Sequence, residues 1–280
     1  MRFACLNTVA PGTSFAEQCA AIAQAGCEGV ETIVFPSTDL DAWLCEVRAT
    51  TMDMGLEVVA VIVGGLALHR EGHMQYVRAA MQATCELGAS SLLTPEYAAQ
   101  NPLPLFPPFP APGADERARV MAAMGEIGAL VTSLKGRVLI EPITPFESRF
   151  CRSVADALAL CTASHSPLVQ IALDTHNMNL TEVNVAASIR AASMRIGHVH
   201  LADNNRMLPG HGHIDFDEVM TALSEVNYNG WLSFECAVPG DFVSEVRQAI
   251  ARIETRRAER PPGRVSSTRE SASLPSHGTI

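Results

Sequence analysis

The sequence predicts an α/β protein built as a single (β/α)8 TIM barrel. Short runs of β-branched and other apolar residues alternate with longer amphipathic segments, which indicates parallel strands covered by helices. Eight such strand–helix units follow one another in 280 residues, a common length for this fold. No glycine-rich dinucleotide-binding sequence follows the first predicted strand, so the pattern favours a closed barrel over an open doubly wound sheet.

The first half of the chain alternates strands and helices between clear boundary signals. The helix predicted at 14–26 ends at a glycine, and the helix at 38–55 begins at a Thr-Asp cap. The stretch NPLPLFPPFPAPG, 101–113, can form neither a helix nor a central strand, so it is predicted to be a long irregular loop. The predicted strands are 2–7, 27–35, 56–65 and 89–97, and the predicted helices are 14–26, 38–55, 71–88 and 114–136.

The second half shows the same alternation more regularly. Its predicted strands are 137–143, 169–175, 195–203 and 230–236, and its predicted helices are 153–164, 182–193, 215–226 and 241–260. We assign residues 1–255 to the barrel. The end of the chain is rich in Ser, Pro and Gly, and this composition predicts a disordered tail over 256–280.

The composition argues against several classes of protein. The formal net charge is −10, whereas tight non-specific binding to nucleic acid needs clustered Lys and Arg. The eight cysteines are scattered without a C-x-x-C pair, which favours buried reduced thiols over a disulfide framework. No stretch has the length of an uncharged membrane span, and the N-terminus lacks a signal-peptide pattern. We therefore expect a cytoplasmic protein that binds neither nucleic acid nor membrane.

Metal-competent side chains stand at the ends of the last four predicted strands. Glu141, Asp174, His200 and Glu235 each occupy this place, and Asp203 follows the seventh strand. In a TIM barrel these ends meet at one face, where active sites lie. Three carboxylates and an imidazole would repel one another without a cation among them. Such a ligand set suits Mn²⁺, Mg²⁺ or Co²⁺ better than a thiolate-type zinc site.

The alternation of side chains along each strand supports this convergence. Counting back from Glu141, Leu139 shares its face, while Val138 and Ile140 lie on the other face. The same count applied to the sixth and eighth strands puts their bulky apolar residues toward the helices. The acids are therefore predicted to point into the barrel mouth, with His198 one layer below His200.

Four segments give the chain a resemblance to a known family. They are EPITPFES at 141–148, DTHNMN at 174–179, HVHLADNNRMLPGHGHIDF at 198–216 and SFE at 233–235. In this order they resemble the xylose isomerase-like TIM barrels, in particular the ketose 3-epimerases of the tagatose/psicose type and their sugar-phosphate isomerase relatives. The resemblance covers residues 1 to about 255 as an architecture.

The resemblance implies an activity and a role for each matching residue. It implies a metal-dependent sugar epimerase or isomerase, acting on a ketose or keto-acid through a metal-bound enediolate, with one divalent cation, most simply Mn²⁺. Glu141 and Glu235 match its acid/base pair, and Glu147 and Arg206 match residues that hold substrate oxygens. The metal ligands that it implies are Glu141, Asp174, His200 and Glu235.

One position departs from the family pattern. The family has Asp-x-x-His after the sixth strand, whereas here Asn177 takes the place of that histidine and His176 precedes it on an irregular turn. Both residues are retained as candidate substrate-binding residues. The orientation of the substrate depends on which of the two side chains points inward.

Other readings of the chain remain open. A dehydratase of the inosose type would use the same cation and enolate, and an apurinic endonuclease-like hydrolase or a non-catalytic sugar-binding barrel are more distant alternatives. No Lys/Arg cluster marks a phosphate clamp, which favours an unphosphorylated substrate, and a homodimer or homotetramer is left open.

Secondary candidates surround the main set. His198 is expected to orient the site or to be a satisfied core histidine, and Asp203 to support the site or form a turn. Asp215 is expected to cap a helix, and Glu96 to be a solvated loop acid in preference to a residue that lines the pocket. His211 and His213 are expected to be loop or site-lining residues in preference to metal ligands, and PLPLFPPFP is a candidate lid or subunit contact.

Overall fold

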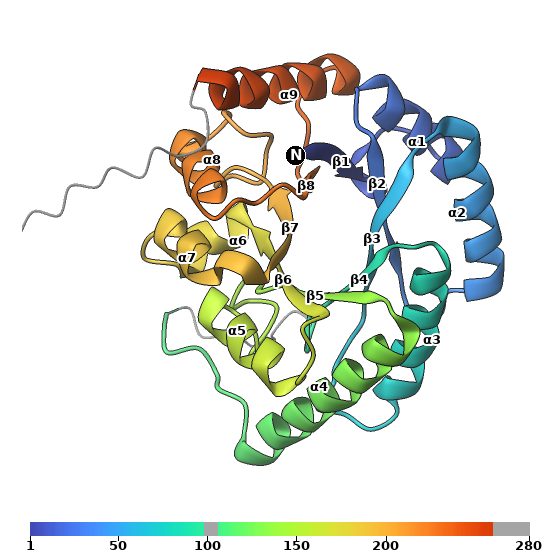
Figure 1. Cartoon of the computed structure of the whole chain (residues 1–280), viewed down its shortest axis with the longest axis vertical. Helices are drawn as coiled ribbons and strands as arrows, with labels where there is room; N and C mark the ends of the chain where they lie inside the picture. Colours follow the sequence, from blue (N-terminus) through green and yellow to red (C-terminus); the bar gives the residue numbers. More distant parts are fainter. Residues whose placement is uncertain (98–105, 260–280) are drawn as a thin grey trace, which may run out of the picture.

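The computed structural model describes residues 1–97 and 106–259. Within these residues, parallel strands pair in chain order and the last pairs with the first, so that the barrel predicted from the sequence is confirmed (Figure 1). The strands are β1 (Arg2–Leu6), β2 (Gly29–Val34), β3 (Glu57–Val63), β4 (Ser90–Leu93), β5 (Arg137–Ile140), β6 (Val169–Asp174), β7 (Ile196–Leu201) and β8 (Trp231–Phe234).

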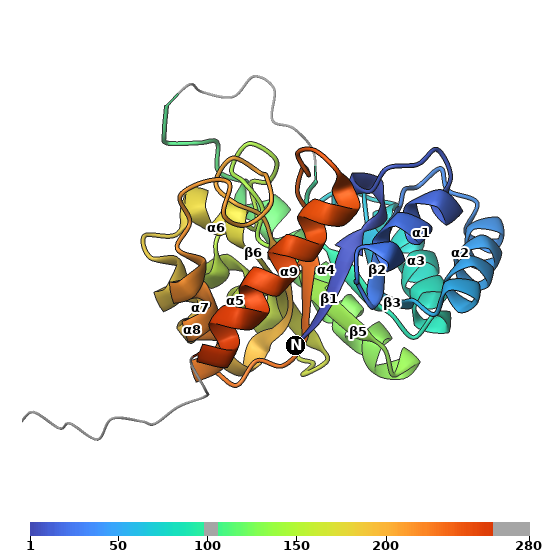
Figure 2. The same ribbon diagram turned by 90° about the horizontal axis from the view of Figure 1, so that it is seen from above.

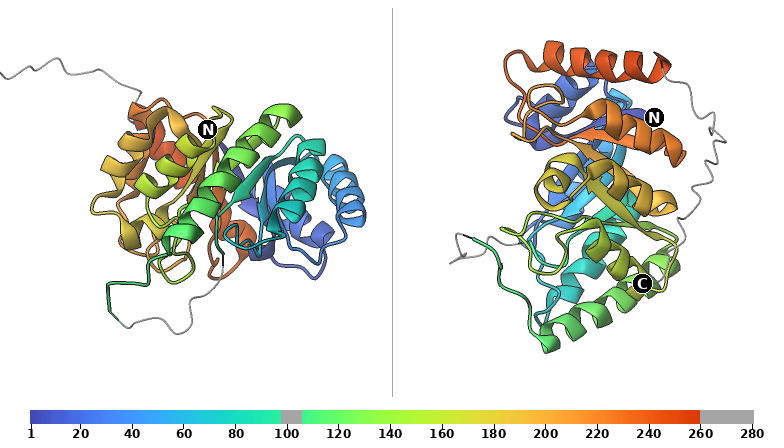
Figure 3. Two further views of the ribbon diagram at one scale, coloured as in Figure 1. Left: turned by 90° about the horizontal axis from the view of Figure 1, so that it is seen from below. Right: turned by 90° about the vertical axis from the view of Figure 1, so that its left-hand side faces the viewer.

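Helices surround the barrel on its outside, as two further sides of the molecule show (Figure 3). The last helix packs against both the first helix and its own predecessor, which closes the outer ring (Figure 1). The helices are α1 (Phe15–Gln24), α2 (Leu40–Met54), α3 (His73–Glu86), α4 (Ala114–Leu134), α5 (Val154–Ala163), α6 (Thr175–Thr181), α7 (Val185–Ala192), α8 (Phe216–Glu225) and α9 (Phe242–Glu259).

Local capping determines where several helices begin and end. Ser14 accepts a hydrogen bond from the Glu17 amide, and the Glu17 side chain accepts one from the Ser14 amide, so α1 begins with a capping box. Asp39 caps α2, which ends at Gly55 in the left-handed conformation at φ 65°. The Asp39 cap confirms the signal expected at the start of the second helix, whereas the Ser14 capping box was not predicted.

Two segments differ from, or lie beyond, what the sequence predicted. The turn expected after the sixth strand is instead the seven-residue helix α6, because the Asp174 carboxylate accepts a hydrogen bond from the Asn177 amide and caps it. Helix α9 continues to Glu259, which confirms the helix predicted at 241–260 and shows that residues 256–259 of the predicted disordered tail are helical. The rest of the predicted tail lies outside the described residues, and so do residues 98–105, which include 101–105 of the predicted loop.

The hydrophobic core has an inner and an outer part. The inner cluster lies inside the barrel and consists of Ala4, Val59, Ala60, Leu92, Leu139 and Ala172. The outer core, between strands and helices, contains Val138, Ile140, Ile171 and Leu173. The strand parity read from the sequence is therefore confirmed. Because the inner cluster is small, the upper barrel interior is left to polar side chains.

The strands bring their carboxyl ends together at one end of the barrel. Figure 2 shows the barrel from the side, with the N-terminus at the opposite end from the loop that follows β7. The site therefore has to be sought at this end. Among the described helices, none has the length and hydropathy needed to cross a lipid bilayer.

Candidate metal centre and active site

Four predicted side chains meet at the carboxyl end of the barrel. Asp174 is the last residue of β6 and His200 lies in β7, while Glu141 and Glu235 directly follow β5 and β8. Each offers one ligand atom, and these atoms all lie within 4.8 Å of one another. Asp174 and His200 are fully buried, Glu141 is nearly so, and the Glu235 side chain is 17% exposed. We call these four residues the carboxylate–histidine cluster.

His200 Nδ1 lies at the centre of the carboxylate–histidine cluster. It is 2.9 Å from Glu141 Oε1, 3.0 Å from Glu235 Oε2 and 4.0 Å from Asp174 Oδ2. One nitrogen thus faces three carboxylates that come from three other strands. A single cation could contact one atom from each of the four residues, so the geometry fits a four-ligand metal site.

The two carboxylate oxygens of Asp174 have different surroundings: one caps helix α6 and the other belongs to the cluster. Its Oδ1 accepts the Asn177 amide at 2.8 Å and starts α6. Its Oδ2 is buried and has no hydrogen-bond partner among the described residues. A buried carboxylate oxygen without a partner is costly, and a cation bound by the cluster would satisfy it. The donor set, three carboxylates and one imidazole, matches Mn²⁺, Mg²⁺ or Co²⁺.

The pKa values of the cluster residues indicate that its buried carboxylates favour a nearby positive charge or a proton. Burial raises the pKa of Glu141 to about 7 and, together with Glu235, raises that of Asp174 to about 6. Burial alone would lower the pKa of His200, but Glu31, Glu235 and Glu141 raise it well above its ordinary value. Without a metal, a proton on His200 therefore supplies the positive charge.

A buried acid that the sequence analysis did not single out lies beneath the cluster. Glu31, in the middle of β2, is fully buried; its Oε2 is 2.9 Å from His200 Nε2 and its Oε1 is 2.6 Å from His198 Nε2. Burial raises its pKa, but His200 and His198 lower it more, so Glu31 is ionised. The sequence offers one signal for Glu31, namely an acidic residue within the apolar run GVETIV. The histidines that Glu31 contacts are distant in sequence.

Asp203 organises the loop between β7 and α8. Its buried carboxylate accepts hydrogen bonds from the backbone amides of Asn204, Gly210, Gly212 and Ile214, at 2.8–3.1 Å. A Cβ on Gly212 would lie 2.3 Å from Asp203 Oδ1, so only glycine fits there. The sequence left two roles open for Asp203, supporting the site or forming a turn. In the structure its carboxylate stabilises the turn through these four hydrogen bonds.

This loop carries Arg206 to the cluster. Arg206 lies at φ 59°, its carbonyl accepts the Ala237 amide at 2.8 Å, and its guanidinium is 3.8 Å from Glu235 Oε2. The backbone is thus fixed between the Asp203 turn and the segment after β8. The exposed guanidinium end stands beside an acid of the cluster, where it can meet a substrate oxygen.

Glu147 and Tyr97 lie near the same mouth. Glu147 Oε2 accepts a hydrogen bond from Thr144 Oγ1 at 2.8 Å, which holds it on the loop after β5. Burial raises the pKa of Tyr97, and the charges of Glu147, Glu235 and Glu141 raise it further. Tyr97 is 44% exposed and was not selected from the sequence, because its segment contains no motif.

The two residues after Asp174 differ in orientation. His176 Nδ1 lies 3.1 Å from the backbone oxygen of Asp203, so its ring contacts the β7–α8 loop. Asn177 is buried, and its side-chain oxygen has no hydrogen-bond partner among the described residues. Asn177 is therefore the better placed of the two for a polar ligand, and a substrate-binding role for either stays a prediction.

Glu96 is not the solvated loop acid expected from the sequence. It is buried, and its carboxylate receives the guanidinium of Arg149, with Nη2 2.8 Å from Oε1, and the Arg149 amide. The expectation failed because its partner lies in a distant loop. Asp215 caps α8 as expected, and His211 and His213 are exposed loop residues.

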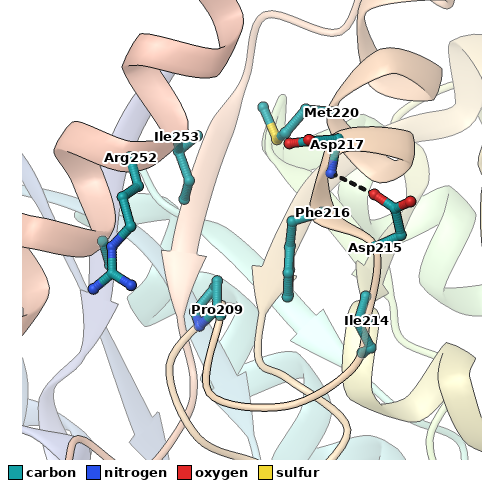
Figure 4. Close-up of a pocket in the computed structure, with 10 residues that line it drawn as sticks. Pro209, Ile214, Asp215, Phe216, Asp217, Met220, Arg252 and Ile253 are labelled. Atoms are coloured by element: carbon teal, nitrogen blue, oxygen red, sulfur yellow. Dashed lines mark hydrogen bonds between the residues drawn. The ribbon is translucent and has the colours of Figure 1, made fainter.

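A cleft of about 360 Å³ lies outside this site, between α8, α9 and the loop after β7. Figure 4 shows Arg252 and Ile253 of α9 facing Phe216 and Met220 of α8 across it. No member of the carboxylate–histidine cluster lines this cleft. We therefore regard the barrel mouth as the candidate active site.

The comparisons with known proteins agree with this architecture. The sequence profile of the xylose isomerase-like TIM barrel family matches residues 19–256, and the chain belongs to this family. A solved structure of 3-keto-D-glucoside 4-epimerase from Escherichia coli superposes with a TM-score of 0.79, covering 91% of this chain and 99% of that one at 22% identity. At this identity the likeness shows the fold.

Sequence relatives are also sugar epimerases by name. L-ribulose 3-epimerase of Mesorhizobium japonicum is 34% identical over 125 residues, which are 45% of this chain and 42% of that protein. 3-Dehydro-D-guloside 4-epimerase of E. coli strain K12 is 24% identical over 220 residues, which are 75% of this chain and 84% of that protein. The match to the ribulose enzyme thus spans less than half of its length.

Proposed function

We propose that this member of the xylose isomerase-like TIM barrel family is a divalent-metal-dependent sugar epimerase that removes and returns a proton next to a carbonyl group. The observation that supports this most directly is the cluster of Glu141, Asp174, His200 and Glu235 at the barrel mouth, with Asp174 Oδ2 still lacking a partner among the described residues. The epimerase names of its relatives point in the same direction.

Glu141 and Glu235 are proposed as the acid/base pair. They follow β5 and β8, which are separated in the barrel by β6 and β7. A sugar between them could be approached from two sides. One carboxylate would take the proton from the carbon next to the carbonyl, leaving an enediolate. The other, in its protonated form, would deliver a proton to the opposite face of the same carbon and invert it.

The four cluster residues are proposed to hold one divalent cation, with Mn²⁺ fitting the donor set and Mg²⁺ or Co²⁺ as alternatives. When bound, the cation polarises the substrate carbonyl and acidifies the adjacent C–H. Asp174 contributes a fixed oxygen, because its other oxygen is committed to the cap of α6.

Arg206 and Glu147 are proposed to hold hydroxyl groups of the substrate. Arg206 is anchored through its backbone and its guanidinium lies 3.8 Å from Glu235, close to where the proton would move. We propose a free ketose in preference to a sugar phosphate, since Arg149, a second guanidinium near the mouth, is already engaged by Glu96 and Glu116.

The proposal is tested by assaying a panel of free ketoses for epimerisation. Protein freed of metal with EDTA is compared with the same protein reloaded with Mn²⁺, Mg²⁺ or Co²⁺, and the products are separated by chromatography. We expect conversion between two ketose epimers only in the reloaded protein. Release of water from the substrate would identify a dehydratase, and equal activity with and without metal would contradict the proposal.

A further inference from the structure

Glu31 is a buried acid to which the proposed chemistry gives no task. It lies in β2, across the barrel from β7, and is fully buried inside the ring of strands. Its two oxygens contact two different histidines of β7, with Oε1 2.6 Å from His198 Nε2 and Oε2 2.9 Å from His200 Nε2. Both distances are those of strong hydrogen bonds to a charged acceptor.

These contacts specify how both imidazole rings are protonated. An ionised carboxylate only accepts hydrogen bonds, so both Nε2 atoms must carry hydrogen. In the neutral form of His200 the lone pair is then on Nδ1, the atom that lies 2.9 Å from Glu141, 3.0 Å from Glu235 and 4.0 Å from Asp174. A metal ligand needs this tautomer, because a nitrogen must be unprotonated to coordinate.

Glu31, His198 and His200 could also be considered as a second metal site, since their donor atoms lie within 4.8 Å of one another. The hydrogen-bond contacts argue against it. Each Glu31 oxygen is already satisfied by an N–H, and an ion would have to separate pairs that are 2.6 Å and 2.9 Å apart. The arrangement is that of a carboxylate supporting a histidine ligand.

We propose that Glu31 is a positioning residue that holds His200 in the Nε2–H tautomer, so that its Nδ1 lone pair faces the metal site, and that His198 keeps the Glu31 carboxylate in place. This inference rests on the proposed function, because it requires the carboxylate–histidine cluster to bind a metal. Glu31 itself contacts neither metal nor substrate in this account.

Glu31→Gln is the most direct test, since it keeps the size of the side chain. A glutamine offers one acceptor oxygen and an NH₂ donor, so only one of the two histidines can keep its Nε2–H against it. We expect Mn²⁺ affinity, measured by calorimetry, to fall about 10–100-fold. Ser233→Ala is the matched control: Ser233 lies inside the barrel, pairs in register with His200, and its hydroxyl has no partner among the described residues. It should bind Mn²⁺ within about threefold of the wild type, a change below 1 kcal/mol.

A second measurement reports the tautomer itself. With ¹⁵N-labelled histidine and Mg²⁺ as a diamagnetic ion, the His200 signal, assigned by its loss in His200→Asn, should show a protonated Nε2 and an unprotonated Nδ1 in the wild-type protein. In Glu31→Gln, His198 or His200 should change its protonated nitrogen. A residue that supported only the fold would leave this pattern unchanged.

The outcomes separate this inference from the proposed function. If the wild type binds no divalent ion, both are overturned. If the wild type binds Mn²⁺ and Glu31→Gln binds it within threefold of the wild type, only the role of Glu31 is overturned, whichever histidine changes its protonated nitrogen. If Glu31→Gln does not fold, Glu31→Asp decides the question in the same way, since it withdraws the carboxylate by one methylene: reduced affinity supports the proposal, and wild-type affinity overturns it.

Discussion

At the scale of single residues, Glu141 and Glu235 belong to the same cluster, but their pKa values are shifted in opposite directions. Burial raises the pKa of Glu141 to about 7, whereas His200 and Arg206 lower the pKa of Glu235 despite its burial. Two carboxyl groups with pKa values pushed apart are suited to opposite proton-transfer roles. In the metal-free protein, Glu141 is therefore the member that more readily holds a proton at neutral pH.

The same pKa values predict how pH affects the metal-free protein. The pKa of Glu141, about 7, and of Asp174, about 6, exceed the values near 4 expected when unfolded, so the folded state binds more protons and loses stability as pH rises through this window. His200 acts in the same direction, because its folded pKa is also raised. The lowered pKa values of Glu31 and Glu235 matter only below about pH 4.5.

We therefore expect the Tm of EDTA-treated protein to fall between about pH 5 and pH 8, measured by calorimetry. Mn²⁺ should raise Tm more at the upper end of this range, because protons compete with the metal for the ligands. The metal-loaded protein serves as the control, with a flatter profile. A Tm that rises with pH in the metal-free protein would contradict the assignment.

Residues of the cluster could be predicted because each stands at the end of a strand or directly after it, and the fold brings strand ends together. Glu31 could not be predicted in this way, because its role depends on contacts with histidines of β7, and only the folded barrel brings these residues near. Glu96 was misinterpreted for the same reason, since its partner Arg149 is distant in sequence. Pairings across the barrel leave no local pattern.

At the scale of elements, the loop between β7 and α8 depends on Asp203. Asp203→Ala removes the acceptor of four backbone amides, and we expect the free energy of unfolding to fall by about 2–4 kcal/mol. Because the loop positions Arg206, KM should rise more than kcat falls. Urea unfolding and steady-state kinetics measure both effects.

The control for this loop is Asp53→Asn on the exposed side of α2, which should change stability by less than about 0.5 kcal/mol. Asp203→Asn keeps one acceptor oxygen, so its loss of stability should be intermediate between those of Asp203→Ala and Asp53→Asn. If Asp203→Ala unfolds at the wild-type urea concentration, the loop does not depend on this carboxylate.

A second element-scale contact connects two loops and the start of helix α4 through Arg149. Its guanidinium pairs with buried Glu96 after β4 and with Glu116 in the first turn of α4, and it lies two residues from Glu147. Arg149→Met leaves Glu96 buried without its guanidinium, and we expect a loss of about 3–5 kcal/mol in urea unfolding. Arg78→Met removes the exposed Arg78–Glu126 pair and should cost at most about 1 kcal/mol. Equal losses in both variants would show that burial of the pair is unimportant.

Helix α6 shows what local patterns leave out. The sequence suggested a turn because THNMN has no apolar periodicity, yet the Asp174 cap starts a short helix there. This helix directs His176 toward the β7–α8 loop and buries Asn177. The cap thus explains the result of the one-residue departure from the family pattern, in which His176 contacts the loop and Asn177 is buried.

At the scale of the whole molecule, the barrel makes distant residues neighbours. Its strand order and inward-facing positions could be predicted because apolar runs and amphipathic segments alternate regularly along the chain. The bulges of β3 and β7, where register shifts occur, could not, since they follow from the pairing of neighbouring strands. The outline of the site therefore followed from the sequence, while its supporting contacts required the fold.

The central claim, proton removal next to a carbonyl by a metal-loaded barrel, is tested most directly by hydrogen exchange. Mn²⁺-reloaded protein is incubated with free ketoses and keto-acids in D₂O, the metal is removed, and the substrates are examined by NMR. We expect metal-dependent deuterium uptake at the carbon next to the carbonyl, reduced about 10²–10⁴-fold in Glu141→Gln and Glu235→Gln. Tight metal binding without deuterium uptake into any substrate would contradict the account.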